Sequence, residues 1–132
     1  IGSILERISF CHKHDTVNLN LNINSLGFDN ELRPILLDFS RSFVLAKNNK
    51  IDRFESIMSS TSPELALLMG NKSPLMNIEL NGKVLRKSDS WRVGVLLYTL
   101  ITGKLPYQNA TNLDGFITSI LTKDPIIPIQ DI

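Results

Sequence analysis

Amide and carboxylate side chains are the groups in this sequence whose types and spacing could form a site. Asparagines stand at positions 18, 20, 22 and 24, alternating with apolar residues, and Asp38 follows a second apolar run. The carboxylate of Asp38 is a hard-oxygen ligand of the kind that Mg²⁺ prefers. An amide cannot accept a proton at neutral pH, so the asparagines cannot serve as general bases. The single cysteine, Cys11, excludes a disulfide framework and a multi-cysteine metal site.

The overall composition is that of a soluble globular domain. The chain has 132 residues, of which 42% are hydrophobic and 20% are charged, and its formal net charge is +1. This balance of charge excludes a strongly basic surface for nucleic acid or for an anionic membrane. No apolar run approaches the roughly 20 residues that a membrane-spanning helix needs.

Hydrophobic periodicity predicts the elements that would position these residues. Apolar residues recur at helical spacing over 1–14, which indicates a helix with one buried face. The alternation over 17–24 is typical of a half-buried strand. Two apolar runs, 26–29 and 34–38, flank a polar turn and predict a hairpin.

Polar composition predicts irregular structure on both sides of a short helix. Residues 40–62 are polar and serine-rich, so we expect a loop there. Pro63 suits the first turn of a helix that follows this loop. Residues 70–87 again lack a period and are expected to be irregular.

Two further helices are predicted in the C-terminal third. Apolar residues over 89–102 point in nearly every direction, which is typical of a helix buried on most sides. Ser88 or Asp89 can cap its start, and Gly103 can end it. A last helix over 112–122 carries apolar residues on one face.

Four short motifs stand in an informative order along the chain. They are Phe10-Cys11-His12, Leu36-Leu37-Asp38-Phe39-Ser40, Ser62-Pro63-Glu64 and Ser88-Asp89-Ser90-Trp91-Arg92-Val93-Gly94-Val95-Leu96-Leu97-Tyr98. In this order they are similar to the Y-L-H, D-F-G, A-P-E and D-x-W-x-x-G-V-x-L-Y motifs of eukaryotic protein kinases. The chain therefore resembles the C-terminal lobe of that fold. The resemblance implies an α+β class, mainly α-helical with short β-hairpin strands, and it implies that residues 1–132 are only part of the lobe.

The resemblance places the family's catalytic loop, H-R-D-x-K-x-x-N, on residues 18–25. Asn20 then replaces the catalytic Asp, Asn22 replaces the Lys that neutralises the phosphoryl group, and Ser25 replaces the metal-binding Asn. Of these positions, only 38 keeps the residue type that binds metal in the family, as Asp38. Because neither amide carries the charge that these steps need, the resemblance implies a domain impaired in phosphoryl transfer.

Other matched positions are structural in the family. Asp89 is expected to accept hydrogen bonds from the backbone of the catalytic loop, although an acid near a helix start could equally serve the helix dipole. Trp91 and Gly94 accompany it, and Trp91 is expected to be part of the core. Phe39 follows the metal-binding Asp, and Glu64 is expected to pair with an Arg beyond the last helix.

A second alignment stays open. Lys13-His14-Asp15, with Asn20 after it, also resembles H-R-D-x-x-x-x-N and would restore a catalytic Asp at Asp15. It predicts that Asn20 points at Asp38, whereas an exposed Asp15 at the helix end would argue against it. Under this alignment the protein would be a divergent Ser/Thr protein kinase that transfers the ATP γ-phosphate to protein hydroxyls.

The leading hypothesis is a pseudokinase that acts through protein partners, with the 112–122 helix and the 40–62 loop as candidate surfaces. The segment alone is not expected to hold a cofactor, and Mg-ATP binding would need an N-terminal lobe. Without further elements the 89–102 helix would expose apolar side chains, so we expect the remainder of the domain to cover them. A helical interaction domain whose motifs match by chance is the remaining alternative.

The longer interval between Glu64 and Asp89, which indicates an insertion near 70–85, and the altered catalytic loop also resemble the rhoptry-type kinases and pseudokinases of apicomplexan parasites. That subfamily would imply a secreted protein, whereas most kinase-fold proteins are cytoplasmic.

Overall fold

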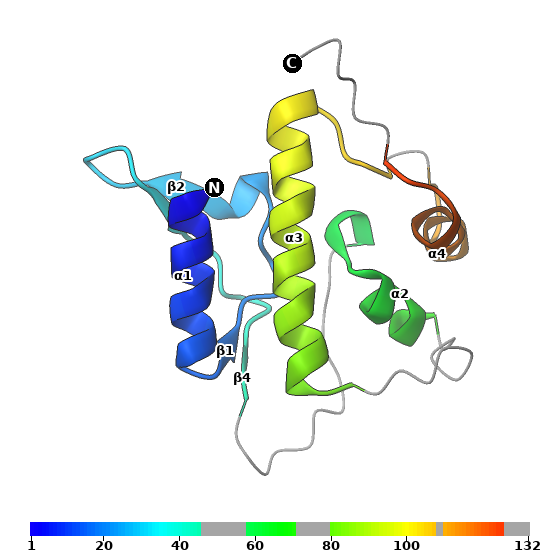
Figure 1. The fold of residues 1–132 in the computed structure, drawn as a ribbon, viewed down its shortest axis with the longest axis horizontal. Coiled ribbons are helices and arrows are strands. Elements are labelled where there is room, and N and C mark those ends of the chain that lie inside the picture. The colour runs from blue at the N-terminus through cyan, green and yellow to red at the C-terminus, as the bar shows by residue number, and fades with distance from the viewer. Residues whose placement is uncertain (46–57, 71–79, 108–109, 126–132) are drawn as a thin grey trace.

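The computed structural model places a long central helix, α3 (Gly82–Thr102), between two groups of elements (Figure 1). Helix α1 (Gly2–Lys13) lies on one side, and α2 (Pro63–Met69) and α4 (Leu113–Thr122) lie on the other. The structure describes residues 1–45, 58–70, 80–107 and 110–125. Helices combined with short antiparallel strands confirm the expected α+β class. Within the described ranges, no helix has the length and apolar character needed to cross a membrane.

Helix α3 is the hub of the core. It contributes Val93 and Leu96 to a cluster with α1, and Leu85 to a cluster beneath the loop that follows α1. On its other side, Trp91 packs against a cluster built from α2 and α4. Burial on several sides agrees with the nearly continuous apolar pattern of this helix.

The predicted hairpin is confirmed. Strands β2 (Leu26–Phe28) and β3 (Pro34–Leu36) pair in antiparallel register. Oδ1 of Asp29 accepts the backbone N–H groups of Glu31 and Arg33, each at 2.9 Å. A short polar side chain that bonds its own turn explains why this sequence reverses direction there.

The predicted strand over 17–24 is wrong except at its first residue. Strand β1 (Thr16–Val17) pairs with β4 (Phe43–Val44), and the chain then forms a loop that ends in a 3₁₀ turn, η1 (Ile23–Ser25). Residues 18–21 are all buried, apolar and amide alike. The alternation therefore does not separate a core face from a solvent face, which is the assumption behind the strand prediction.

The start of α3 also differs from the prediction. The helix begins at Gly82, and the side chain of Asn81 accepts the backbone N–H of Val84 at 3.0 Å as its N-cap. The expected cap at residues 88–89 and the expected irregular structure over 82–87 are therefore wrong. The hydrophobic period does not reveal this first part of the helix because its apolar residues are sparse.

The other predicted helix ends are confirmed. Ser62 caps α2 through the N–H of Leu65, and Asn112 caps α4 through the N–H of Gly115. Helix α3 ends at Gly103, whose φ of 70° lies in the left-handed region that suits glycine.

The predicted 40–62 loop is described only in part. It contains β4 and a 3₁₀ turn, η2 (Met58–Ser60), which its polar composition concealed. Residues 46–57 lie outside the described residues. The same holds for 71–79, which include most of the expected insertion.

Candidate functional site

Asp89 of α3 holds the loop at residues 18–25 through hydrogen bonds from the loop backbone. Oδ2 of Asp89 accepts the backbone N–H of Asn18, and Oδ1 accepts that of Leu19, each at 2.8 Å. Nε2 of His12 lies 2.9 Å from Oδ2. Asp89 is 0% exposed, and a buried carboxylate is costly unless donors surround it. The two backbone hydrogen bonds, from Asn18 and Leu19, are of the kind that the kinase resemblance implies.

Leu19 adopts a backbone conformation that is unusual for its side chain. Its φ is 55°, in the left-handed region, which costs a non-glycine residue about 1 kcal/mol. The hydrogen bond to Asp89 holds the N–H of this residue. Because Asp89 lies in the interior of α3, the alternative role of an acid at the helix start is wrong.

Two asparagine side chains join the loop to the segment after β3. Nδ2 of Asn18 donates to the backbone carbonyl of Asp38 at 3.2 Å, and Oδ1 of Asn18 accepts the N–H of Asn20 at 3.0 Å. Asn18 and Asn20 are each 1% exposed. Both amides therefore belong to the buried framework of the loop.

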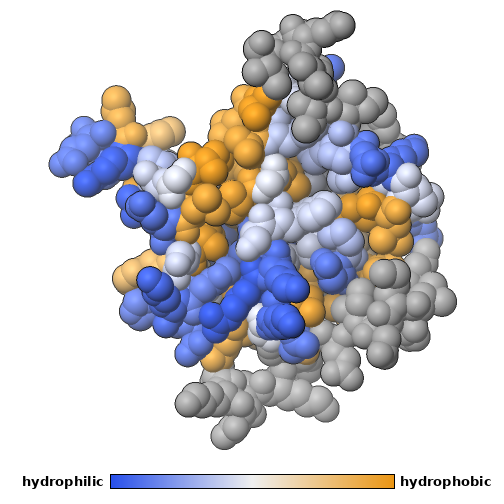
Figure 2. Space-filling view, in the orientation of Figure 1, coloured by the Kyte–Doolittle hydropathy of each residue, from blue (hydrophilic) through white to orange (hydrophobic). Residues whose placement is uncertain are grey.

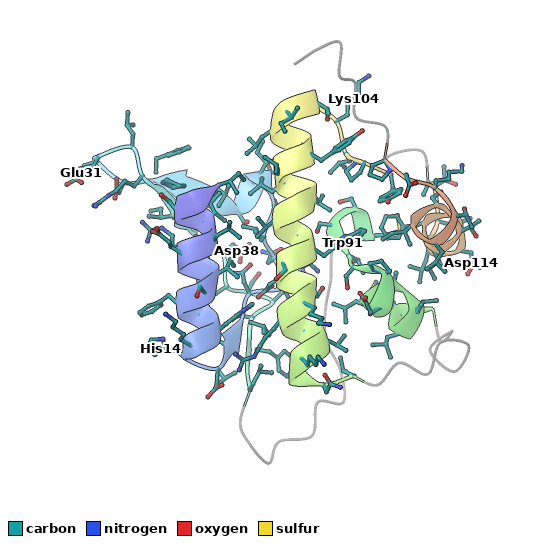
Figure 3. The ribbon with its side chains drawn as sticks, in the orientation of Figure 1. His14, Glu31, Asp38, Trp91, Lys104 and Asp114 are labelled. Carbon is teal, nitrogen blue, oxygen red and sulfur yellow. The ribbon has the colours of Figure 1, made fainter. Side chains whose placement is uncertain are left out.

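Asp38 lies at the centre of a small polar cluster between α1 and α3 (Figure 3). Its Oδ1 accepts the backbone N–H of Ser40 at 2.9 Å. Hydrogen bonds from the side chain and backbone of Ser40, then from the Asn20 side chain, and the charge of Arg41 hold the pKa of Asp38 below its usual range. Nη1 of Arg41 donates to Oδ1 of Asn20 at 3.1 Å.

Asn22 and Ser25 satisfy each other in a local turn. The backbone N–H of Asn22 donates to Oγ of Ser25, and that hydroxyl donates to the carbonyl of Asn22, each at 2.9 Å. The Asn22 side chain donates to the carbonyl of Asn20 at 2.7 Å and accepts the N–H of Asn24 at 2.9 Å. Both side chains serve the shape of the loop.

The residues of this cluster do not fit a divalent cation held in the kinase manner. Mg²⁺ requires near-octahedral oxygen ligands. The hydroxyl of Ser25 is engaged in its own turn, and Oδ1 of Asn20 accepts from the guanidinium of Arg41. In the part of the chain that the structure describes, no three His, Cys, Asp or Glu side chains gather as metal ligands.

Comparison with known proteins places this geometry in context. No family model matches the chain. It is 30% identical over 127 residues to "NUAK family SNF1-like kinase 1" of Mus musculus, covering 95% of this chain and 18% of that protein. It is 30% identical over 123 residues to a probable serine/threonine-protein kinase of Dictyostelium discoideum, covering 93% of this chain and 7% of that protein. The chain has a protein kinase-like fold.

A third relative agrees with the first two. The kinase-like chain is 25% identical over 122 residues to an SNF1-like protein kinase of Schizosaccharomyces pombe, covering 91% of this chain and 18% of that protein. The chain therefore spans less than a fifth of each of these three relatives. The shared region is the C-lobe, because it contains α3 and the loop that α3 supports.

Asp15 lies outside the polar cluster of the kinase-like C-lobe. Its side chain is 63% exposed, and its Oδ1 accepts from Nη2 of Arg86 at 2.7 Å. This exposed position at the end of α1 argues against the second alignment. Asn20 does bond Asp38, as that alignment also predicted, but Asp15 is not beside them to act as a base.

The remaining residues that match the kinase motifs differ in how far they are buried. Phe39 is 41% exposed, and Glu64 is half-buried in the first turn of α2. Trp91 lies on the side of α3 that faces α2 and α4, as expected for a core residue (Figure 3). Gly94 is exposed, and a Cβ added there would meet no described atom within 4 Å.

Two arginines near the loop were not singled out from the sequence. Arg92 of α3 is 0% exposed, and its Nη1 donates to Oγ of Ser60 at 2.7 Å. Burial lowers the pKa of Arg92 to about 10, with Asp89 opposing the shift and Arg41 adding to it. A charged residue within an apolar helix was a signal for Arg92, whereas nothing in the local pattern marked Arg41.

Proposed function

We propose that this protein is a pseudokinase, a kinase-like domain that works by binding other proteins. The observation that carries the proposal is the environment of Asn20, the residue aligned with the catalytic Asp. Its amide is 1% exposed, it accepts from Arg41, and it hydrogen-bonds Asp38. A buried neutral amide that is already engaged cannot take up the proton of a substrate hydroxyl.

The positive charge required for phosphoryl transfer is also missing from the aligned position. Asn22 is neutral, and its side chain bonds the backbone of Asn20 and Asn24. It therefore offers no charge to a migrating phosphoryl group, which such reactions stabilise electrostatically. Arg41 is a cation nearby, but its guanidinium is engaged with Oδ1 of Asn20.

The test is a transfer assay on the full-length protein with radiolabelled ATP and Mg²⁺. We expect label incorporation into the protein and into a generic Ser/Thr substrate to equal the no-protein blank. Asp15→Ala and Asp38→Ala variants, with Asp124→Ala as an exposed acid control, identify the source of any signal. Transfer that Asp15→Ala or Asp38→Ala abolishes and Asp124→Ala leaves intact would establish the alternative, a divergent Ser/Thr kinase.

The exposed apolar face of α3 supports the proposal that residues 1–132 are part of a larger kinase-like domain. Leu97, Leu100 and Ile101 are 41%, 53% and 47% exposed. Figure 2 shows hydrophobic surface over this half of α3 and beside α1. A groove of about 310 Å³ continues this face between Trp91 and Tyr107. Contiguous apolar surface of this kind is normally covered in a soluble protein.

Protein partners are proposed to bind the outer face of α4. Its apolar face packs on α2, while Asp114, Thr118 and Leu121 are exposed on the other side. A pull-down with the full-length protein and its Thr118→Arg variant tests this surface, since a long charged side chain there would block a docked partner. Equal recovery of partners by both proteins would exclude the α4 surface.

Cofactor use, subfamily and location stay predictions. Mg-ATP binding by the whole protein would require an N-terminal lobe. A rhoptry-type origin, with the secretion that it implies, depends on the long interval before Asp89 and on the altered loop.

A further inference from the structure

Arg41 is fixed in the polar cluster by the turn that follows Asp38. The backbone N–H of Ser42 donates to the carbonyl of Phe39 at 3.0 Å, and the Ser42 hydroxyl donates to the same carbonyl at 2.6 Å. This turn brings Arg41 back toward the 18–25 loop. Its Nη1 then reaches Oδ1 of Asn20.

Asn20, the residue that binds Arg41, is itself held in place. Asn20 is buried, and its backbone N–H is held by the side chain of Asn18. Because Asn20 is neutral, the hydrogen bond to it does not itself offset the positive charge of the guanidinium. That charge acts on Asp38, whose pKa it helps to lower, and it also acts on the buried Arg92.

We infer that Arg41 is the resident cation of this site and that its guanidinium keeps divalent cations away from Asp38. The inference rests on the proposed function, because it explains why the Asp38 site of a pseudokinase would not bind a divalent cation. A divalent ion at Asp38 would be repelled by the charge of Arg41, whose guanidinium bonds the same amide, Asn20, that hydrogen-bonds Asp38. It would also have to compete for Asn20, the oxygen that Arg41 already holds.

The charges of Arg41 and Asp38 in the polar cluster therefore offset each other without a metal ion. Arg41 supplies one positive charge beside the one carboxylate of Asp38, so the cluster needs no added cation to be neutral. Nε of Arg41 is buried and has no hydrogen-bond partner among the described residues. The guanidinium is thus held partly inside the cluster, where its charge is screened less than on the surface.

Titration of the full-length protein with Mn²⁺, with free Mn²⁺ measured by electron paramagnetic resonance, tests this inference. We expect Arg41→Gln to raise Mn²⁺ affinity by about tenfold or more, because the repulsion is removed. Asp38→Asn in the Arg41→Gln background should abolish the gain. Lys104→Gln, which removes an exposed cation just after α3, should bind Mn²⁺ as the wild type does.

A second comparison does not depend on the folding of the Arg41→Gln variant. Wild type and Asp38→Asn should bind Mn²⁺ equally, since Arg41 already excludes the ion in the wild type. Weaker binding by Asp38→Asn than by wild type would overturn the inference, as would equal binding by Arg41→Gln and wild type. Neither result bears on the transfer assay, so failure of this inference and failure of the pseudokinase proposal are distinguishable.

Discussion

The backbone N–H of Leu19 donates a 2.8 Å hydrogen bond to Oδ1 of Asp89, a residue 70 positions later in the chain. Leu19 adopts a left-handed conformation with φ of 55°, and Asp89 is fully buried in α3. The hydrogen bond thus helps to hold Leu19 in its strained conformation. In return, the backbone N–H groups of the loop stabilise the buried charge of Asp89. This contact joins the central helix to the 18–25 loop across the core.

Asp89→Asn should lower the free energy of unfolding by about 3 kcal/mol. The amide can accept from only one side, so one backbone N–H of Asn18 or Leu19 loses its charged acceptor while buried. Urea unfolding of the full-length protein, followed by circular dichroism, measures the change. Asp124→Asn, at an exposed acid, should change the value by less than about 0.5 kcal/mol.

Two matched substitutions locate the start of α3. Asn81→Ala should lower the free energy of unfolding by about 1 kcal/mol, since it removes the N-cap. Ser88→Ala should be neutral or slightly stabilising, because the buried Ser88 hydroxyl has no hydrogen-bond partner in the described part of the chain. The opposite order in thermal denaturation would mean that the helix begins near Ser88.

Arg92→Met should lower the free energy of unfolding by about 3 kcal/mol at pH 7, because the buried Ser60 hydroxyl loses the Arg92 donor and the buried Asp89 carboxylate loses a neighbouring positive charge. The loss should grow as the pH rises above 10. The folded pKa of Arg92 is about 10, below its usual value, so the folded wild type loses its proton before the unfolded chain does and gains relative stability above pH 10. Urea unfolding at pH 7, 10 and 11 checks the trend.

A matched variant controls for the general effect of alkaline pH. Lys87→Met removes an exposed cation from the same helix and should show no comparable loss of stability at pH 7. A stability difference between Arg92→Met and wild type that stays constant from pH 7 to pH 11 would contradict the buried-charge account.

Ser40→Ala should raise the pKa of Asp38 toward its usual value. The Ser40 side chain is the largest cause of the lowered pKa, and the substitution leaves the backbone N–H in place. Because the folded pKa is lowered, Asp38 contributes stability above its unfolded pKa, and this contribution is lost as the pH falls through the folded pKa. Carboxyl ¹³C NMR of the wild type and variant measures the shift. Ser42→Ala, in the same turn, should leave the pKa of Asp38 nearly unchanged.

Local features of the sequence predicted much of the fold. The hairpin around Asp29 and the helix starts at Pro63 and near Asn112 were each predicted from a few consecutive residues, and in each the structure shows a side chain that bonds neighbouring backbone. Such contacts can be recognised in a few consecutive residues. The kinase-like motifs likewise predicted the α+β class and the contact of Asp89 with the 18–25 loop.

Tertiary packing decided the burial and the charge contacts of the 18–25 loop, which these local patterns do not reveal. The sequence by itself determined which residues the 18–25 loop contains, and therefore that Asn20 and Asn22 carry no charge. Only the folded chain buries both faces of residues 18–21 and brings Arg41 to Asn20, because burial and charge pairing depend on segments distant in sequence. The same reason applies to Arg92, whose pKa depends on the loop and turn that α3 meets in the folded structure.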